Sequence, residues 1–316
     1  MDRENLSKNI RCLIEAVEAC EELTPARTRQ LLQEATLSAD DLQPWADYDH
    51  PKADSYGRKM LFDGGCFELM VMSWAPGDMS AIHDHGFTQW GAVRLFGDAE
   101  HAMFRVQDGT MRTIERAVYP EGSVVPVNHD MVHQMGNTGE TPFMSLHLYG
   151  CYERQSDVTA DARLYELDRG EVCRTSGGVF FDLPADAVLR SEAGPTPDFP
   201  TWLRHQVELL RRLTHAHGKP SGRAADVLEQ LTDVATWERG RAAFAALDKL
   251  QPGVAERRRQ HFIQEMRAAA ELLVSLRSRD LIDLDTAGLE DLLAGEAAHF
   301  ATAALEAMPQ TAPVTA

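Results

Sequence analysis

The segment from residue 56 to residue 183 consists of short apolar runs separated by residues that favour turns. The runs are too short and too closely spaced to alternate with the helices of βαβ units. This pattern predicts an antiparallel barrel or sandwich. The runs are CFELMVMSWA (66–75), QWGAVRLFG (89–97), AEHAMFRV (99–106), GTMRTIERAVY (109–119), GSVVPV (122–127), PFMSLHLYG (142–150) and GGVFFDL (177–183).

Helical patterns flank this segment on both sides, so the predicted fold class is α+β with a separate C-terminal helical bundle. Four prolines between 184 and 200 indicate a linker. We expect N-terminal helices that pack on the barrel (1–50), a barrel domain (51–185), a linker (186–200), a helical bundle of unknown role (201–308) and a frayed tail (309–316).

The composition narrows the classes of partner. The formal net charge is −18, and an acidic surface repels nucleic-acid phosphates and anionic membranes. No apolar run reaches the length of about 18 residues that a transmembrane helix needs, and charges interrupt the N-terminal residues where a secretory leader has an apolar core. We therefore expect no nucleic acid or membrane partner and a cytoplasmic location. The C-terminal helices are candidates for a homo-oligomer interface.

His83 and His85 are the first candidates for chemistry. Side chains two residues apart in a strand point to the same face, so both imidazoles would project into one interior. Neutral imidazoles side by side suit a divalent transition metal, although a lone HxH pair also occurs without one. A third histidine, His133, lies in another strand-like run, MVHQMGN. Together the three histidines form a candidate metal site.

His215 and His217 have the same HxH spacing, but they lie at the end of a predicted helix. In a helix, residues i and i+2 point apart, so this pair cannot share a metal ion. We assign it no site. The other histidines are interpreted as surface or core residues: His50, His101, His129, His205, His261 and His299.

The residues from Gly77 to Gly97 resemble the first cupin motif, in which a glycine, HxH, a glutamate and a second glycine follow one another at set distances. His133 and Asn137 resemble the end of the second cupin motif. Trp90 occupies the place of the glutamate, which is a metal ligand in most metal cupins. The remaining set of three histidines resembles that of the cysteine dioxygenase family. This resemblance implies a cupin β-barrel, an antiparallel double-stranded β-helix, that binds Fe(II) through His83, His85 and His133.

Two further matches flank the histidines in the sequence. Ser145, His147 and Tyr149 resemble the SxHxY run of that family, whose side chains form a hydrogen-bonded relay that ends beside the iron. Tyr56 and Arg58 resemble its YxR element, whose arginine binds the substrate carboxylate. The resemblance therefore implies catalytic roles for the first three residues and substrate-binding roles for the other two.

Trp90 is also a departure from the family. In animal members a cysteine bonds covalently to the relay tyrosine. Simple counting places Trp90 at that position, or Gly91 with a shift of one residue, so no thioether to Tyr149 can form there. We expect Trp90 to lie near the metal and to shape the substrate pocket. The resemblance covers about residues 1–183.

These matches imply an iron-dependent thiol dioxygenase that converts a small carboxylated thiol, cysteine or a cysteine-like thiol, and O2 to the sulfinate. Arg58 favours a carboxylated substrate, whereas Trp90 disfavours free cysteine, so 3-mercaptopropionate or a larger thiol of specialised metabolism is an alternative. Another metal cupin oxygenase or isomerase and a non-enzymatic sensor are further alternatives. The SLHLY run and the three histidines argue against these two.

Overall fold

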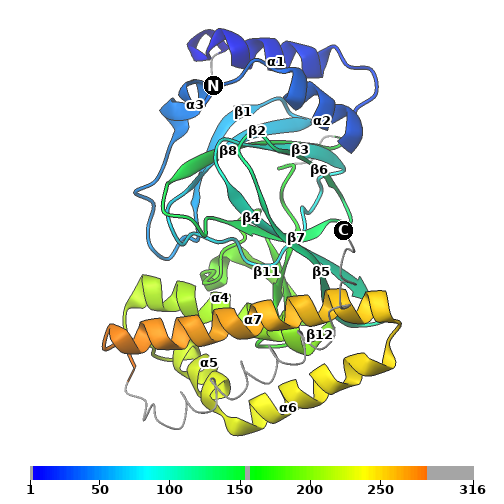
Figure 1. Cartoon of the computed structure of the whole chain (residues 1–316). Helices are drawn as coiled ribbons and strands as arrows, with labels where there is room; N and C mark the ends of the chain where they lie inside the picture. Colours follow the sequence, from blue (N-terminus) through cyan, green and yellow to red (C-terminus); the bar gives the residue numbers. More distant parts are fainter. Residues whose placement is uncertain (1–2, 154–156, 283–316) are drawn as a thin grey trace, which may run out of the picture. The chain divides into compact units, whose positions relative to one another are not determined.

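The computed structural model describes residues 3–153 and 157–282 of the chain (Figure 1). The chain divides into two compact units, Met1–Thr196 and Pro197–Ala316. The division lies within the stretch 186–200 that the sequence predicts to be a linker.

Short helices begin the first unit: η1 (Arg3–Asn5), α1 (Lys8–Glu18), α2 (Pro25–Glu34), α3 (Ala39–Leu42) and η2 (Gln43–Trp45). The elements that follow are β1 (Gly57–Asp63), β2 (Phe67–Trp74), β3 (Trp90–Leu95), β4 (Ala99–Gln107), β5 (Thr110–Tyr119), β6 (Val124–Asn128), β7 (Val132–Gly136), β8 (Phe143–Gly150), β9 (Ala162–Glu166), β10 (Glu171–Thr175), η3 (Ala185–Ala187), β11 (Val188–Ala193) and β12 (Thr196–Pro197).

The first sheet has the order β1-β2-β8-β3-β6, and all its strand pairs are antiparallel. β2 and β8 are buried along their whole length. Leu69 and Val71 of β2 belong to the core cluster shared with the N-terminal helices, whereas Met70 and Met72 line a cavity inside the barrel. Because alternate residues of a strand point to opposite faces, this sheet contributes to two separate interiors.

The N-terminal helices cover the outer face of the first sheet, as predicted. Leu13 and Ile14 of α1 lie in one core cluster with Leu69 and Leu148 of the sheet. Thr24 begins α2 by accepting a hydrogen bond from the backbone N–H of Arg27 at 3.2 Å, with proline next in the chain. This N-cap satisfies one of the free N–H groups of the first helical turn.

Arg94 of β3 joins the end of α2 to the sheet. Its guanidinium donates hydrogen bonds to the carbonyl oxygens of Leu32 at 3.0 Å, Ala35 at 2.7 Å and Leu37 at 3.3 Å. These carbonyls lie at and beyond the C-terminus of the helix, where backbone acceptors lack helical partners. One side chain therefore both caps α2 and fixes it to β3.

The second sheet has the order β12-β5-β4-β7. The extended segment 79–83 continues it beyond β7, through the bridges Met79↔Gly136 and His83↔His133. One sheet thus contains β2-β8-β3-β6 and the other contains segment 79–83, β7, β4 and β5. This distribution of eight successive extended segments is the strand order of a double-stranded β-helix. The predicted fold class, an α+β chain with a cupin barrel, is confirmed.

The structure differs from the sequence-based expectation between residues 160 and 200. Residues 177–183 are irregular and do not form the predicted strand. β9, β10 and β11 form a further antiparallel sheet, so part of the expected linker 186–200 is a strand paired with β10. Pro184 and Pro195 stand outside β11, where a missing N–H costs no hydrogen bond of the sheet. Proline content was therefore a poor guide to a linker here.

The described part of the second unit is helical: α4 (Phe199–His217), α5 (Arg223–Thr232), α6 (Val234–Ala245), η4 (Ala246–Lys249) and α7 (Pro252–Ser278). Phe199 of α4 stacks on Phe262 of α7, with ring centroids 5.4 Å apart. His215 and His217 lie in the last turn of α4, as predicted. Residues 283–308 of the expected bundle and the expected tail lie outside the described residues. Within the described ranges, no helix has the length and apolar character to span a membrane.

Candidate metal centre and active site

Three histidines meet inside the barrel. His83 and His85 lie on the extended segment after β2, and His133 lies on β7, which pairs with that segment at His83. All three side chains are buried, and one possible ligand atom from each lies within 4.8 Å of the others. Nε2 of His83 and Nε2 of His133 are 3.2 Å apart. The structure therefore brings together the three predicted metal ligands.

Hydrogen bonds hold two of these rings with Nε2 toward the cluster. Nδ1 of His83 donates to the carbonyl oxygen of Ala81 at 2.8 Å, and Nδ1 of His133 lies 2.9 Å from Nε2 of His101. A proton on Nδ1 leaves the Nε2 lone pair available to a metal ion. Neither ring nitrogen of His85 makes a hydrogen bond of normal geometry with the described residues. A buried polar group without a partner is costly, and a metal ion at this cluster would supply the partner.

Burial keeps the three histidines neutral. It lowers the pKa of His83 to about 4, and it lowers the pKa values of His85 and His133 well below their usual 6.5. The neighbouring histidines lower the last two pKa values further. Only an unprotonated imidazole nitrogen binds a metal ion. Donor type, orientation and protonation state therefore all fit a transition-metal ion.

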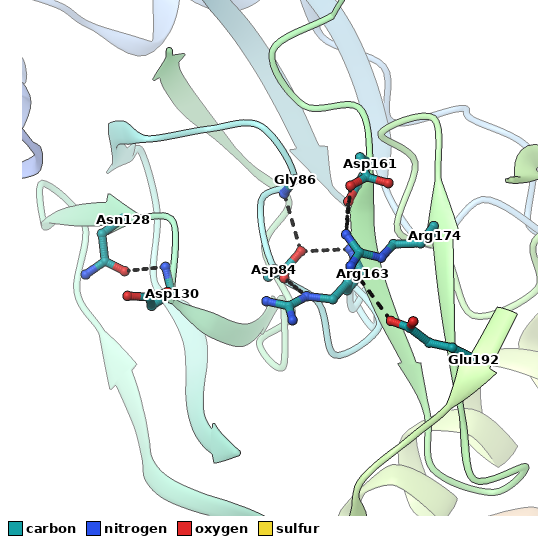
Figure 2. Close-up of polar contacts among 8 residues, drawn as sticks. All are labelled: Asp84, Gly86, Asn128, Asp130, Asp161, Arg163, Arg174 and Glu192. Atoms are coloured by element: carbon teal, nitrogen blue, oxygen red, sulfur yellow. Dashed lines mark hydrogen bonds and ion pairs between the residues drawn. The ribbon is translucent and has the colours of Figure 1, made fainter. Parts of the chain in front are cut away.

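Asp84, between His83 and His85 in the sequence, anchors their segment (Figure 2). Its Oδ1 accepts hydrogen bonds from the backbone N–H groups of Arg163 at 2.7 Å and Gly86 at 3.3 Å. Its Oδ2 pairs with the guanidinium of Arg163. Because Arg163 belongs to β9, these contacts tie the ligand segment to the neighbouring strand and fix the directions of His83 and His85.

Ser145, His147 and Tyr149 project from one face of β8 and form a chain of hydrogen bonds. Ser145 Oγ lies 2.7 Å from Nε2 of His147, and Nδ1 of His147 lies 2.7 Å from the Tyr149 hydroxyl. A fourth residue extends the chain, because the indole N–H of Trp74 donates to Ser145 Oγ at 2.9 Å. The Tyr149 ring lies beside the histidine cluster, with its centroid 5.3 Å from that of the His85 ring.

Trp74 sets the direction of this chain. An indole N–H can only donate, so Ser145 Oγ accepts from Trp74. The Ser145 hydroxyl is fully buried, and the arrangement that gives its own hydrogen an acceptor directs that hydrogen to Nε2 of His147. Burial lowers the pKa of His147 to about 3, which keeps the ring neutral with its single proton on Nδ1. That proton is donated to the oxygen of Tyr149. The hydroxyl hydrogen of Tyr149, whose pKa is raised by burial, is then left to donate into the cavity.

Arg58 and Tyr56 lie on the wall of the same cavity. Arg58 is on β1, and its Nη2 donates to the hydroxyl of Thr159 at 2.9 Å. Tyr56 is buried and stacks on Trp74 with ring centroids 4.8 Å apart. Burial raises the pKa of Tyr56 to about 12, so its hydroxyl keeps its proton. Both predicted substrate-binding residues therefore face the histidine cluster.

Trp90 is not on the cavity wall, and the expectation that it shapes the pocket was wrong. It lies in the core cluster between the first sheet and the N-terminal helices, on the same side as Leu148. Trp90 pairs with Gly150 across the β3–β8 ladder, whereas Gly91 pairs with Tyr149. Directly paired residues share a face of the sheet, so the position opposite the relay tyrosine belongs to Gly91.

The groups described above enclose a small cavity of ≈ 30 Å³. Arg58, Tyr149 and the three histidines provide its polar wall, and Met70, Met72, Met135, Ala162 and Val179 provide much of its apolar wall. A volume of about 10–15 Å³ on this measure holds one water molecule. The space therefore suits a small ligand.

Sequence reasoning missed several residues that support the site. His101 was interpreted as a surface or core residue, but it is buried beside His133. Trp74 follows Met70 and Met72 at alternate positions, a signal that it faces inward. Thr159 carried no signal at all, because it comes to Arg58 from a loop 101 residues away in the sequence.

Three buried, neutral histidines that could hold a metal ion thus lie inside the double-stranded β-helix of a cupin. The family model described as cysteine dioxygenase type I matches residues 17–155. This part of the chain is similar to that family.

Curated relatives carry the same name. The chain is 28% identical to cysteine dioxygenase type 1 of Danio rerio over 129 residues, which are 38% of this chain and 62% of that protein. It is 30% identical to the Homo sapiens protein over 124 residues, 37% of this chain and 62% of that protein. The chain thus spans 62% of the length of these relatives.

Solved structures with similarity to the chain include two from bacteria. An uncharacterised protein with a double-stranded β-helix domain from Klebsiella pneumoniae has a TM-score of 0.31 at 15% identity, over 42% of this chain and 99% of that one. A cupin superfamily protein from Desulfitobacterium hafniense has a TM-score of 0.24 at 16% identity, over 30% and 75% of the two chains. Likenesses this weak carry no argument, and the fold rests on the strand order.

Proposed function

We propose that this chain is a non-haem Fe(II) thiol dioxygenase, which converts a small carboxylated thiol and O2 to the sulfinate. One observation carries the proposal: Arg58, Tyr149 and the three histidines face the same small cavity. The cavity is thus surrounded by the Arg58 cation, which can bind a carboxylate, by the Tyr149 hydroxyl donor and by the three histidines that can hold a metal ion. Its size suits a small ligand. The match of residues 17–155 to the cysteine dioxygenase type I family model supports the reaction class.

Arg58 would hold the substrate by its carboxylate. A guanidinium presents a planar fork of N–H donors that matches the two oxygens of a carboxylate. Thr159 already accepts one of these N–H groups at 2.9 Å, which limits the directions the fork can take. If Arg58 binds the carboxylate of a short thiol, the sulfur at the other end of the thiol points toward the histidine cluster.

Tyr149 would donate a hydrogen bond to the bound reactants. Its hydroxyl hydrogen is directed away from His147 by the chain of donors that begins at Trp74. Because the groups of this chain are buried, water does not compete for their hydrogen bonds. A donor that is held in place costs little reorganisation when charge develops beside it.

When bound at His83, His85 and His133, an Fe(II) ion supplies the one-electron chemistry by which dioxygen reacts with a thiol. The overall reaction balances without a further reductant. The sulfur gives up four electrons, both oxygen atoms of O2 end in the sulfinate, and the thiol proton is released.

The identity of the thiol is best tested between cysteine and 3-mercaptopropionate. The argument against free cysteine came from Trp90, and it no longer applies because Trp90 faces the N-terminal helices. Arg58 favours a carboxylate, which both thiols have. Oligomerisation through the C-terminal helices stays a prediction.

The test is to load the protein with Fe(II) without oxygen, add a thiol, admit O2 and measure oxygen uptake and the product mass. The panel is cysteine, 3-mercaptopropionate, cysteamine and bulkier carboxylated thiols. We expect a sulfinate from a carboxylated thiol and a much slower reaction of cysteamine. No sulfinate from any thiol contradicts the proposal, and metal analysis of the isolated protein separates iron from manganese, nickel or zinc chemistry.

A further inference from the structure

Glu68 is a buried carboxyl group that the proposed reaction does not use. It lies on β2 directly opposite Tyr149 of β8, on the inward side with Met70 and Met72, and it is only 4% exposed. Its Oε1 accepts a hydrogen bond from the backbone N–H of Val158 at 2.9 Å. Its Oε2 is buried, and no N–H or hydroxyl group in the described ranges donates a hydrogen bond to it.

Asp157 faces Glu68. Hydrogen bonds connect Asp157 to Arg58 through Thr159. The carboxylate of Asp157 accepts hydrogen bonds from the backbone N–H of Thr159 at 3.0 Å and from its hydroxyl at 2.9 Å. The Thr159 oxygen in turn accepts from Nη2 of Arg58 at 2.9 Å. A continuous path of hydrogen bonds therefore runs from the Asp157 carboxyl, which lies against Glu68, to the guanidinium on the cavity wall.

Two carboxylates can face each other at close range only if they share a proton, because both are otherwise acceptors and both are negative. Burial, together with the negative charge of Asp157, raises the pKa of Glu68 to about 7. The Val158 N–H and the charge of Arg58 act in the opposite direction. The charged or titratable groups facing Glu68 in the described ranges include Asp157 from the loop, Arg58 and the directly paired Asp63 from β1, and Tyr149 from β8.

We infer that Glu68 and Asp157 form a carboxyl pair which shares one proton and, through Thr159, positions Arg58 to bind the substrate carboxylate. Loss of the proton places two negative charges side by side, which pushes the loop with Thr159 away from β2 and draws the guanidinium from the cavity. Glu68 and Asp157 are thus positioning residues that set the affinity for carboxylated thiols. The inference rests on the proposed function for the part that concerns substrate.

The shared proton is tested first, in the metal-free protein and without any thiol. Urea unfolding is measured between about pH 5 and about pH 8 for the wild type, for Glu68→Gln and, as a control, for Glu140→Gln on an exposed loop. A group whose folded pKa is raised stabilises the fold below that pKa, and the gain is lost as the pH rises through it. Relative to Glu68→Gln, the folded-to-unfolded equilibrium constant of the wild type should fall about ten- to hundredfold over this range.

The effect on substrate is tested by the KM for a carboxylated thiol over the same pH range. The KM of the wild type should rise about three- to tenfold relative to that of Glu68→Gln, because the amide keeps a donor toward Asp157 at every pH. The KM for cysteamine, which has no carboxylate, should show no such difference. Asp157→Asn, at a less buried position, should abolish the pH dependence in the same way if Glu68→Gln does not fold.

The outcomes separate the two ideas. Equal pH dependence of stability in the wild type and Glu68→Gln overturns the carboxyl pair, whatever the enzyme does. A shared proton without any change in the relative KM overturns its role in positioning Arg58. If no thiol is oxidised at all, the proposed function is wrong, whereas the stability measurement still decides on the pair.

Discussion

Gly91 of β3 pairs with Tyr149 of β8, and a Cβ added at Gly91 would lie 2.8 Å from Cδ1 of the Tyr149 ring. The same atom would lie 2.6 Å from the carbonyl oxygen of Leu148. Both distances are far inside normal contact. Counting along the family motif left two candidates, Trp90 and Gly91, for the position opposite Tyr149. That position is Gly91, which leaves room for the Tyr149 ring.

Gly91→Ala is expected to displace Tyr149, because the Leu148 carbonyl belongs to the β3–β8 pairing and cannot yield. We expect a loss of about 1–3 kcal/mol in the free energy of unfolding and a fall in kcat of about a hundredfold. Urea unfolding and oxygen uptake measure the two effects. Gly139→Ala is the matched control, since its added Cβ would meet only Asn137 Oδ1, at 3.4 Å. Equal effects of the two variants would contradict the argument.

Trp74→Phe removes the donor that directs the relay and keeps an aromatic ring against Tyr56. Without the indole N–H, Ser145 can turn its hydrogen elsewhere, and the proton of Tyr149 loses its fixed direction. We expect kcat to fall about five- to tenfold while KM changes little. Ser145→Ala should have a similar effect, and the double variant should be no worse than either single one. Additive losses would mean that the two residues act independently.

Arg58→Gln should raise the KM for carboxylated thiols about ten- to hundredfold, the cost of a lost charged hydrogen bond. The rate with cysteamine should hardly change, because that thiol offers no carboxylate. The two steady-state measurements together form the check. A comparable loss with both substrates would show that Arg58 supports the fold of the cavity instead of binding the substrate.

His101→Phe tests the hydrogen bond behind His133. A partner on the far nitrogen of a ligand ring orients the ring, and its removal typically weakens metal affinity about 10- to 100-fold. His85→Ala, which removes a ligand, should abolish tight binding. Competition with a chelator measures both affinities, and His129→Ala on an exposed turn is the control. Unchanged affinity in His101→Phe would leave His101 a packing residue only.

Acid should destabilise the metal-free protein. His83 and His147 have pKa values of about 4 and about 3 in the folded state, against 6.5 when unfolded. The unfolded chain therefore binds more protons, and the stability present above pH 6.5 is lost as the pH falls toward these values. His85 and His133 act in the same direction, whereas Glu68, whose pKa is raised, acts against them. Urea unfolding should show stability falling below about pH 6, less steeply in His147→Phe.

The parts of the site that were predictable are those with a local pattern. Alternation on one strand put Ser145, His147 and Tyr149 on the same face, and the structure shows all three side chains on that face. The spacing of His83 and His85 predicted a shared interior for the same reason. Helical periodicity likewise predicted that the N-terminal helices would cover the barrel, and they do.

The side of the sheet on which Trp90 lies could not be read from its spacing. Pairing of β3 with β8 places Trp90 opposite Gly150, and a register one residue away would have turned it into the cavity. Register depends on contacts between strands that are distant in sequence. The same holds for His101 behind His133 and for Thr159 beside Arg58, which meet only when the fold is complete.

The two faces of β8 have a consequence for how this chain can change. Leu146 and Leu148 pack against the N-terminal helices, while His147 and Tyr149 form the relay between them. An insertion or deletion of one residue in this strand would exchange the two sets, burying the relay among leucines and placing leucines at the metal. Substitutions can accumulate on either face, but the length of the strand cannot drift. A protein with this fold can therefore acquire a different reaction by replacement of side chains on β8, but not by a change in the length of that strand.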